Sequence, residues 1–439
     1  MAEAALIYNL FPPLAGTIPQ WEKHLERVAA MGFTWVYLNP INPPGMSGSL
    51  YAVKDYFGIN PLFYPQGKGD PEAALGHFLK AARSRGLKVM LDLVINHTAI
   101  DSPLVRTHPE WYAHNPDGSV KNPGAIDPAN AQHVTVWGDL AELQYWPPPD
   151  PEGLLDYWDK VLAKYLKLGF AGFRADAAYK IPGDFWAGLI TRARRTAPEA
   201  EFFAETLGCR LDECAQLASS GFNFLYNSSK WWDFLADWCL EQYRQFRKLA
   251  PSVSFPETHD TDRLAAESGG NPAVARQRYL FAAYFSAGLM IPMGFEFGFT
   301  KRLHVVNTRP QDWESPTYDL SPFITRVNAM KLACPILLEE GPQRRVNQAG
   351  EAVVLLLKSG DRQKGRVLAV INATGEGQKA PMPNLGAWLG KPAAAWQDIT
   401  PEAAPWKLKK TGTEISLAPW EMRLLYNPKG APLGDEEDS

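Results

Sequence analysis

The sequence predicts an α/β protein built on a (β/α)8 TIM barrel, with an inserted lobe after the third strand and a small antiparallel β domain near the C-terminus. Short β-like runs alternate with longer amphipathic segments up to about residue 340, which is the pattern of βαβ units and a parallel sheet. The chain holds eight such pairs, and eight repeats favour a closed barrel over an open doubly wound sheet. Beyond them the pattern becomes the alternation typical of antiparallel strands.

The predicted elements follow one another without an internal repeat. The expected barrel strands are residues 6–11, 35–38, 89–94, 172–175, 201–204, 222–225, 253–255 and 290–293. Helices are expected between them, for example over residues 18–31, 72–85, 154–168 and 271–287.

The remaining segments divide the chain into domains. Residues 98–150 are too long and too rich in Pro, Asn and aromatic residues for an ordinary βα connection, so we expect a lobe over the pocket. Residues 1–97 and 151–340 would then form the barrel. Residues 341–428 predict a C-terminal β-sandwich domain with strands at 353–358, 366–371 and 422–426, and residues 429–439 an acidic, disordered tail.

Composition excludes several classes of function. The formal net charge is −4, so no basic surface argues for nucleic acid or an anionic membrane, and a neutral polar substrate fits better. The N-terminus lacks the pattern of a secretory signal and no apolar run is long enough to span a bilayer, so we expect a cytoplasmic protein. The four cysteines have no metal-type spacing and are expected to be free thiols.

Three acidic residues close three separate apolar runs: Asp176, Glu205 and Asp260. In a barrel the carboxyl ends of all strands meet on one face, so these side chains are predicted to share a pocket. Cleavage of an acetal between sugars needs a proton for the leaving oxygen and a carboxylate facing the anomeric carbon, and two carboxylates are the minimum. This arrangement therefore indicates carbohydrate chemistry.

The neighbours of the acids predict different roles. Arg174 lies two positions before Asp176 on a strand, hence on the same face, and its guanidinium would keep the aspartate ionised. Glu205 follows an apolar run that could raise its pKa and keep it protonated. Taken alone, an aspartate beside an arginine is more often a structural ion pair, so the joint pattern carries the hypothesis.

Around these acids the chain resembles the α-amylase superfamily, glycoside hydrolase family 13. The motifs run in the family's order: Asp92 to His97, Gly172 to Asp176, Ala204-Glu205 and His259-Asp260. The resemblance implies that Asp176 is the nucleophile, Glu205 the general acid/base and Asp260 the carboxylate that orients sugar hydroxyls. It covers the barrel from residue 6 to about residue 338.

The resemblance also implies residues that surround the sugar before the cleaved bond. These are Arg174, His97 and His259, together with Tyr51 and Asp55 of a segment similar to the family's Gly-Tyr-x-x-x-Asp motif. Taken singly, each histidine is as well explained as a hydrogen-bonded rim residue and Tyr51 as packing. Trp35, Trp137 and Trp146 are candidate sugar platforms, although most of the 15 tryptophans must simply pack.

Several positions depart from the family pattern. Many members bind calcium through an asparagine like Asn96, but the other ligand positions are Ala141 and Lys180, so we expect no metal there and no cofactor. Lys180 and Tyr179 become candidates for the acceptor side of the cleft, with a solvated lysine as the equal alternative. Arg263 could lie over the pocket or pair with a rim acid.

Three segments, starting at Ala30, His108 and Pro322, are similar to maltosyltransferases that use maltose-1-phosphate. In those enzymes an asparagine after the nucleophile helps to hold the phosphate, and here that residue is Ala177. The chain also has no room for their additional N-terminal domains. Both departures argue against a phosphate donor.

The leading functional hypothesis is a retaining hydrolase that cleaves α-1,4 bonds in maltooligosaccharides or glucans through a covalent glycosyl intermediate. The alternative is an α-glucan transglycosylase or maltosyltransferase with a sugar acceptor. A remote alternative is a non-catalytic carbohydrate-binding relic. The expected partner is an α-glucan, while exo or endo action, chain length, α-1,6 tolerance and oligomeric state are not encoded in the motifs.

Overall fold

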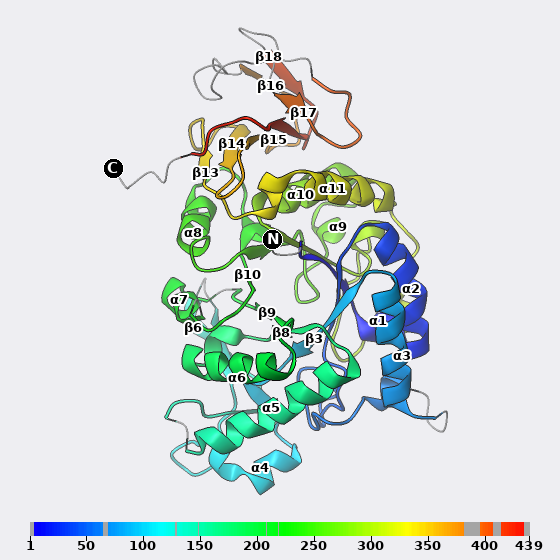
Figure 1. The fold of residues 1–439 in the computed structure, drawn as a ribbon, viewed down its shortest axis with the longest axis vertical. Coiled ribbons are helices and arrows are strands. Elements are labelled where there is room, and N and C mark those ends of the chain that lie inside the picture. The colour runs from blue at the N-terminus through cyan, green and yellow to red at the C-terminus, as the bar shows by residue number, and fades with distance from the viewer. Residues whose placement is uncertain are drawn as a thin grey trace.

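The computed structural model describes residues 4–64, 69–127, 130–147, 149–207, 209–217, 219–381, 396–406 and 414–433. Eight parallel strands close a barrel in the order β1-β12-β11-β10-β9-β8-β3-β2, which confirms the predicted (β/α)8 fold (Figure 1). Their bounds are β1 Leu6–Leu10, β2 Trp35–Leu38, β3 Lys88–Leu93, β8 Gly172–Ala175, β9 Glu201–Ala204, β10 Phe224–Tyr226, β11 Ser252–Ser254 and β12 Gly288–Pro292. Each overlaps its predicted run, because strands buried on both faces read as continuous apolar segments.

Large side chains fill the barrel interior. Phe203 packs edge-on against Trp35 with ring centroids 5.3 Å apart and stacks on Phe224 at 5.1 Å. Trp35 is fully buried here, so it cannot be the sugar platform that its sequence position suggested. The barrel is a packed core, and chemistry is left to the strand ends.

Helices cover the outside of the barrel. The longer ones are α2 Ile18–Ala30, α3 Pro71–Ser84, α5 Pro151–Leu168, α6 Gly183–Thr196, α8 Trp238–Phe246, α10 Pro272–Phe285 and α11 Ser321–Ala333, and the shorter ones α1 Pro12–Ala15, α7 Leu211–Leu217 and α9 Leu264–Glu267. Local sequence fixes their ends: Asp150 accepts a hydrogen bond from the Gly153 N–H at the start of α5, and Gly169 ends that helix with φ at 118°. No described helix is long and apolar enough to cross a membrane.

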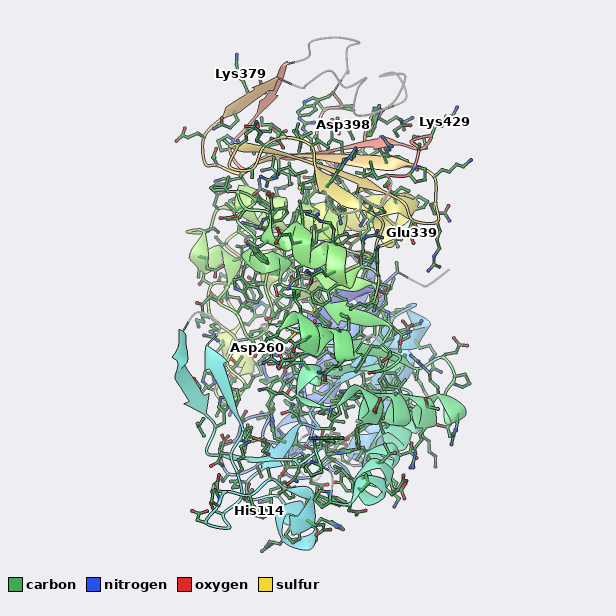
Figure 2. All side chains as sticks on the ribbon, turned by 90° about the vertical axis from the view of Figure 1, so that its left-hand side faces the viewer. His114, Asp260, Glu339, Lys379, Asp398 and Lys429 are labelled. Carbon is green, nitrogen blue, oxygen red and sulfur yellow. The ribbon has the colours of Figure 1, made fainter. Side chains whose placement is uncertain are left out.

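The lobe and the C-terminal sheet lie at opposite ends of the molecule. The lobe holds β4 His97–Ala99, α4 Pro103–Thr107, β5 Gly124–Asp127, β6 Asn130–Val136 and β7 Leu140–Glu142. Figure 2 shows the lobe residue His114 at one end, Lys379 and Lys429 at the other, and Asp260 between them. The domain boundaries stay a prediction, and the acidic residues 434–439 lie outside the described residues.

The C-terminal region is antiparallel, as predicted. One sheet has the order β13-β14-β15-β19-β17, and β16 pairs with β18. The bounds are β13 Gln343–Arg345, β14 Val353–Ser359, β15 Arg366–Asn372, β16 Gln378–Pro381, β17 Gln397–Asp398, β18 Glu414–Leu417 and β19 Met422–Asn427. Alternate residues such as Val354 and Leu356 join the main core, while Leu355 and Leu357 join a second cluster on the other face.

Two buried lysines, Lys331 of α11 and Lys358 of β14, bind the end of α10, and Lys358 thereby ties this sheet to the barrel. Lys331 Nζ donates to the carbonyls of Ala283 and Ser286 at 2.9 and 2.7 Å, and Lys358 Nζ of β14 donates to the Phe285 carbonyl at 3.0 Å. These carbonyls lie at or just beyond the C-terminus of α10, where peptide oxygens lack helical partners and attract cations. Burial lowers the pKa of Lys358 to about 8.

This burial predicts a pH-dependent contribution to stability. The unfolded chain keeps the lysine proton to about pH 10.4, whereas folded Lys358 loses it near pH 8, so in that window the unfolded state binds more protons. The stability of the wild type relative to Lys358→Met should therefore rise between pH 8 and 10, by up to about 3 kcal/mol. Urea unfolding of both proteins at several pH values measures it.

Lys364→Met is the matched control, because Lys364 is exposed in the turn that follows the same strand. Its stability difference from the wild type should not change with pH. If the stability difference between the wild type and Lys358→Met did not change with pH, the lowered pKa of Lys358 would be contradicted.

Candidate active site

The three predicted acids all lie at the carboxyl ends of barrel strands. Asp176 directly follows β8, Glu205 follows β9, and Asp260 lies in the loop after β11. The side chains of Asp176 and Glu205 are 14% and 16% exposed, and that of Asp260 is 52% exposed. Two carboxylates are thus recessed below the rim, while the third faces open space.

Arg174 holds the two recessed acids together. Its Nη1 lies 2.9 Å from Asp176 Oδ1 and its Nη2 lies 3.0 Å from Glu205 Oε2. The same Nη1 lies 2.8 Å from Asp92 Oδ1. Burial alone would lower the pKa of Arg174, but the charges of Asp92 and Glu205 outweigh it and hold that pKa well above its usual value. One permanent cation is therefore shared by three carboxyl groups.

The two recessed acids retain a proton more readily than free carboxylic acids. Burial raises the pKa of Asp176, the Glu205 charge raises it further, and Arg174 opposes both. Burial also raises the pKa of Glu205, against the opposing charge of Arg174. Arg174 thus acts in the expected direction on Asp176, but burial and the Glu205 charge oppose it. We infer that the two carboxyl groups titrate as a pair, so that a first proton bound to one of them disfavours a second.

Hydrogen bonds indicate where that proton lies. Asp176 Oδ1 accepts from Arg174, and its Oδ2 accepts from Asn96 Nδ2 at 3.1 Å, so both oxygens face donors. Glu205 Oε2 accepts from the Ala177 N–H at 2.7 Å and forms an ion pair with Arg174 Nη2 at 3.0 Å, whereas Oε1 has no partner among the described residues. The proton therefore belongs on Glu205 Oε1, which leaves Asp176 ionised.

Asp260 is connected to an aromatic pair. His259 Nε2 lies 3.0 Å from Asp260 Oδ2 and 2.6 Å from the Tyr51 hydroxyl, and the His259 and Tyr51 rings stack at 5.7 Å. Burial would raise the pKa of Asp260, but the charge and hydrogen bond of His259 outweigh it and bring that pKa below its usual value. His259 Nδ1 is buried without a hydrogen-bond partner in the described structure.

Asp92 is the site residue that sequence reasoning left without a role. It is buried, binds Arg174, and accepts hydrogen bonds from the hydroxyls of Tyr37 and Tyr51 at 2.5 and 2.6 Å. Asp92 and Arg174 are register partners in the ladder between β3 and β8. A signal for this role was available in the sequence. Asp92 is an acidic residue inside an apolar run, and the neighbouring strand carries an arginine that can pair with it.

The remaining predicted residues divide into two groups. His97 is buried with Nε2 3.0 Å from the Tyr51 carbonyl, and burial lowers the pKa of His97 to about 4, so it is neutral. Contacts thus link four of the predicted residues to the three acids: Tyr51, His97, Arg174 and His259. The side chains of Asp55 and Arg263 are directed elsewhere. Asp55 is exposed and accepts only the Phe57 N–H. Arg263 is buried in an ion pair with Glu257 at 2.7 Å, so it does not lie open over the pocket.

Tyr179 and Lys180 lie together just after Asp176, in the 3-10 turn η3 Ala178–Lys180. Tyr179 is half-buried, and Lys180 is exposed with Nζ 5.6 Å from the centre of the Tyr179 ring. Their predicted acceptor role stays a prediction.

The residues present do not fit the family's calcium site. Asn96 donates its amide to Asp176, and its Oδ1 faces His97 Nδ1. Lys180 places an ammonium where many family members have a histidine. Within the described part of the chain, no group of three His, Cys, Asp or Glu side chains could hold a metal ion.

Comparison with known proteins finds similar sequences among glucanotransferases and maltosyltransferases. Residues 2–119 match the family model "Glycogen debranching enzyme, glucanotransferase domain". The α-1,4-glucan:maltose-1-phosphate maltosyltransferase of Burkholderia pseudomallei is 28% identical over 79% of this chain and 30% of that enzyme, and the enzyme of the same name from Mycolicibacterium smegmatis is 29% identical over 75% and 51%. The chain therefore spans about half or less of these relatives.

Solved structures share the fold. An α-amylase from Lactobacillus plantarum superposes with a TM-score of 0.75 and 23% identity, covering 96% of this chain and 98% of that one. A noncanonic maltogenic α-amylase from Thermotoga neapolitana superposes equally well, at 20% identity.

The contacts of Asp92 predict a large effect of its removal. Asp92→Asn would remove the buried charge that accepts hydrogen bonds from Arg174, Tyr37 and Tyr51, and breaking a buried pair typically costs about 3–5 kcal/mol. Denaturant unfolding should show a destabilisation of that order. Asp101→Asn is the control, because Asp101 pairs with Lys54 at the surface and should cost at most about 1 kcal/mol. Equal effects of the two substitutions would contradict the role of Asp92.

Proposed function

We propose that this chain belongs to the α-amylase superfamily and is a retaining enzyme that cleaves α-1,4-glucosidic bonds and transfers the released unit to a sugar acceptor. The observation that carries the proposal is the pair of carboxyl groups bound to one guanidinium, Asp176 and Glu205 on Arg174. This shared contact favours the short spacing of retaining enzymes, about 5–5.5 Å.

Each acid then has a distinct role. Ionised Asp176 attacks the anomeric carbon while Glu205 gives its Oε1 proton to the leaving oxygen, and a glycosyl ester on Asp176 results. Asp260 and His259 bind hydroxyls of the same sugar. In the second step Glu205 takes the proton of the acceptor hydroxyl, which displaces Asp176 and restores the α-configuration.

Transfer is preferred to hydrolysis, which reverses the order predicted from sequence. The names of the maltosyltransferase relatives and of the glucanotransferase family model support it. Hydrolysis is the second candidate, because α-amylases share this fold and both reactions use the same acids. The ratio of transfer to hydrolysis depends on how well a bound acceptor sugar excludes water from the site.

An α-glucan, not a glycosyl phosphate, is the proposed donor. Ala177 N–H is already hydrogen-bonded to Glu205, and its methyl group offers no donor to a phosphate. A cytoplasmic location and the absence of nucleic-acid or membrane partners stay predictions.

Product ladders test this assignment. With maltoheptaose the enzyme should form both shorter and longer oligosaccharides, and adding maltose-1-phosphate should not increase chain lengthening. Asp176→Asn and Glu205→Gln should each lower the rate at least about 100-fold, whereas Asp101→Asn should not. Shorter products alone would favour the hydrolase, and unchanged rates in both variants would exclude the mechanism.

The pH profile tests the Glu205 proton. Burial raises the pKa of Glu205 above its ordinary 4.5, so the acid form persists to higher pH and kcat/KM should fall only as pH rises through that higher value. With 4-nitrophenyl maltoside, whose leaving group needs no acid, Glu205→Gln should lose this alkaline limb. An alkaline limb retained in Glu205→Gln would assign it to another group.

A further inference from the structure

Trp231 is a half-exposed tryptophan on the turn that follows β10. The turn is η4 Ser229–Trp231, and the Trp231 side chain is 51% exposed. In the closed barrel β10 lies between β9, which ends at Glu205, and β11, whose loop carries Asp260. Trp231 therefore belongs to the rim segment between the proposed proton donor and the orienting acid.

The ring of Trp231 contacts the core that fills the barrel interior. It meets Phe255 edge-on, with centroids 6.3 Å apart and planes at 88°. Phe255 is buried and belongs to the cluster that fills the barrel interior with Phe203 and Tyr226. Contact with this cluster places the indole on the inner side of the rim, away from the outer ring of helices.

The turn is held firmly on both sides. Asn227 Oδ1 accepts the Ser229 N–H at 3.1 Å, and Asn227 Nδ2 donates to Ser254 Oγ at 3.1 Å and Ser286 Oγ at 2.8 Å. Lys230 Nζ lies 3.1 Å from Glu267 Oε2 of α9. An aromatic ring on such an anchored turn is preorganised, so little entropy is lost when a ligand packs on it.

We propose that Trp231 is the platform on which the acceptor sugar stacks. The inference rests on the proposed transfer reaction, in which the acceptor hydroxyl must reach Glu205. The C–H face of a pyranose packs on an indole, and a sugar held there excludes the water that would otherwise hydrolyse the intermediate. Leu207, in the loop after Glu205, packs partly buried against the same interior cluster and adds apolar surface.

Single exposed tryptophans are common on protein surfaces, so exposure alone does not identify a sugar platform. A second exposed tryptophan, close in the sequence, therefore serves as the control. Trp238, at the start of α8, is 38% exposed and belongs to the outer ring. It has a similar exposure without a place at the barrel mouth.

The experiment compares Trp231→Ala, Trp231→Phe and Trp238→Ala in the full chain, with maltoheptaose as donor and labelled maltotriose as acceptor. Trp231→Ala should raise the acceptor KM for transfer about 10-fold or more, since loss of a stacked aromatic costs over 1 kcal/mol. Its hydrolysis of α-maltosyl fluoride, whose leaving group is not a sugar and does not fill the acceptor position, should fall less than its transfer to maltotriose. Trp231→Phe should restore most of the acceptor affinity, and Trp238→Ala should behave as the wild type.

An unchanged acceptor KM in Trp231→Ala, or equal losses of hydrolysis and transfer, would overturn the proposal. A wild type without any turnover would refute the proposed function instead, and calorimetric binding of maltotriose then decides on Trp231. In the Asp176→Asn background, Trp231→Ala should weaken maltotriose binding while Trp238→Ala does not, and equal binding in both would overturn the platform.

Discussion

The organisation of this site depends on one buried guanidinium. Arg174 on β8 contacts Asp92, Asp176 and Glu205, so one positive charge holds three carboxyl groups around it. A buried cation must be paired, and the pairing here fixes the positions of residues from three different strands. Tyr51 joins the same network through Asp92 and presents its ring to His259. The side chains around the proposed sugar position are thereby oriented before any substrate arrives.

Preorganisation of this kind explains how two similar acids acquire different roles. Asp176 has donors at both oxygens, whereas Glu205 has donors at one oxygen only. In a water-poor site such differences in hydrogen bonding decide which group is ionised. Burial by itself raises the pKa of both, so it favours a shared proton without saying which residue holds it.

The features that depend on strand position could be predicted from the sequence. All eight barrel strands, the C-terminal strands β14, β15 and β19, and the placement of Asp176, Glu205 and Asp260 follow from apolar runs and the residues that end them, whereas β13, β16, β17 and β18 were not predicted. Contacts between segments that are distant in the sequence could not be predicted in this way. The bond network of Asp92 and the burial of Arg263 against Glu257 depend on strand register and loop paths, which local pattern does not encode. Asp55 matched a motif, yet its side chain faces solvent.

The central claim is that Asp176 is the nucleophile of a retaining reaction. A 5-fluoro-α-glucosyl fluoride reacts with retaining enzymes to leave a slowly hydrolysed glycosyl ester, and mass spectrometry of the digested protein locates it. The account predicts a label on the peptide that contains Asp176, and none in Asp176→Asn. A label on another residue, or turnover without any labelled intermediate and with inverted products, would contradict it.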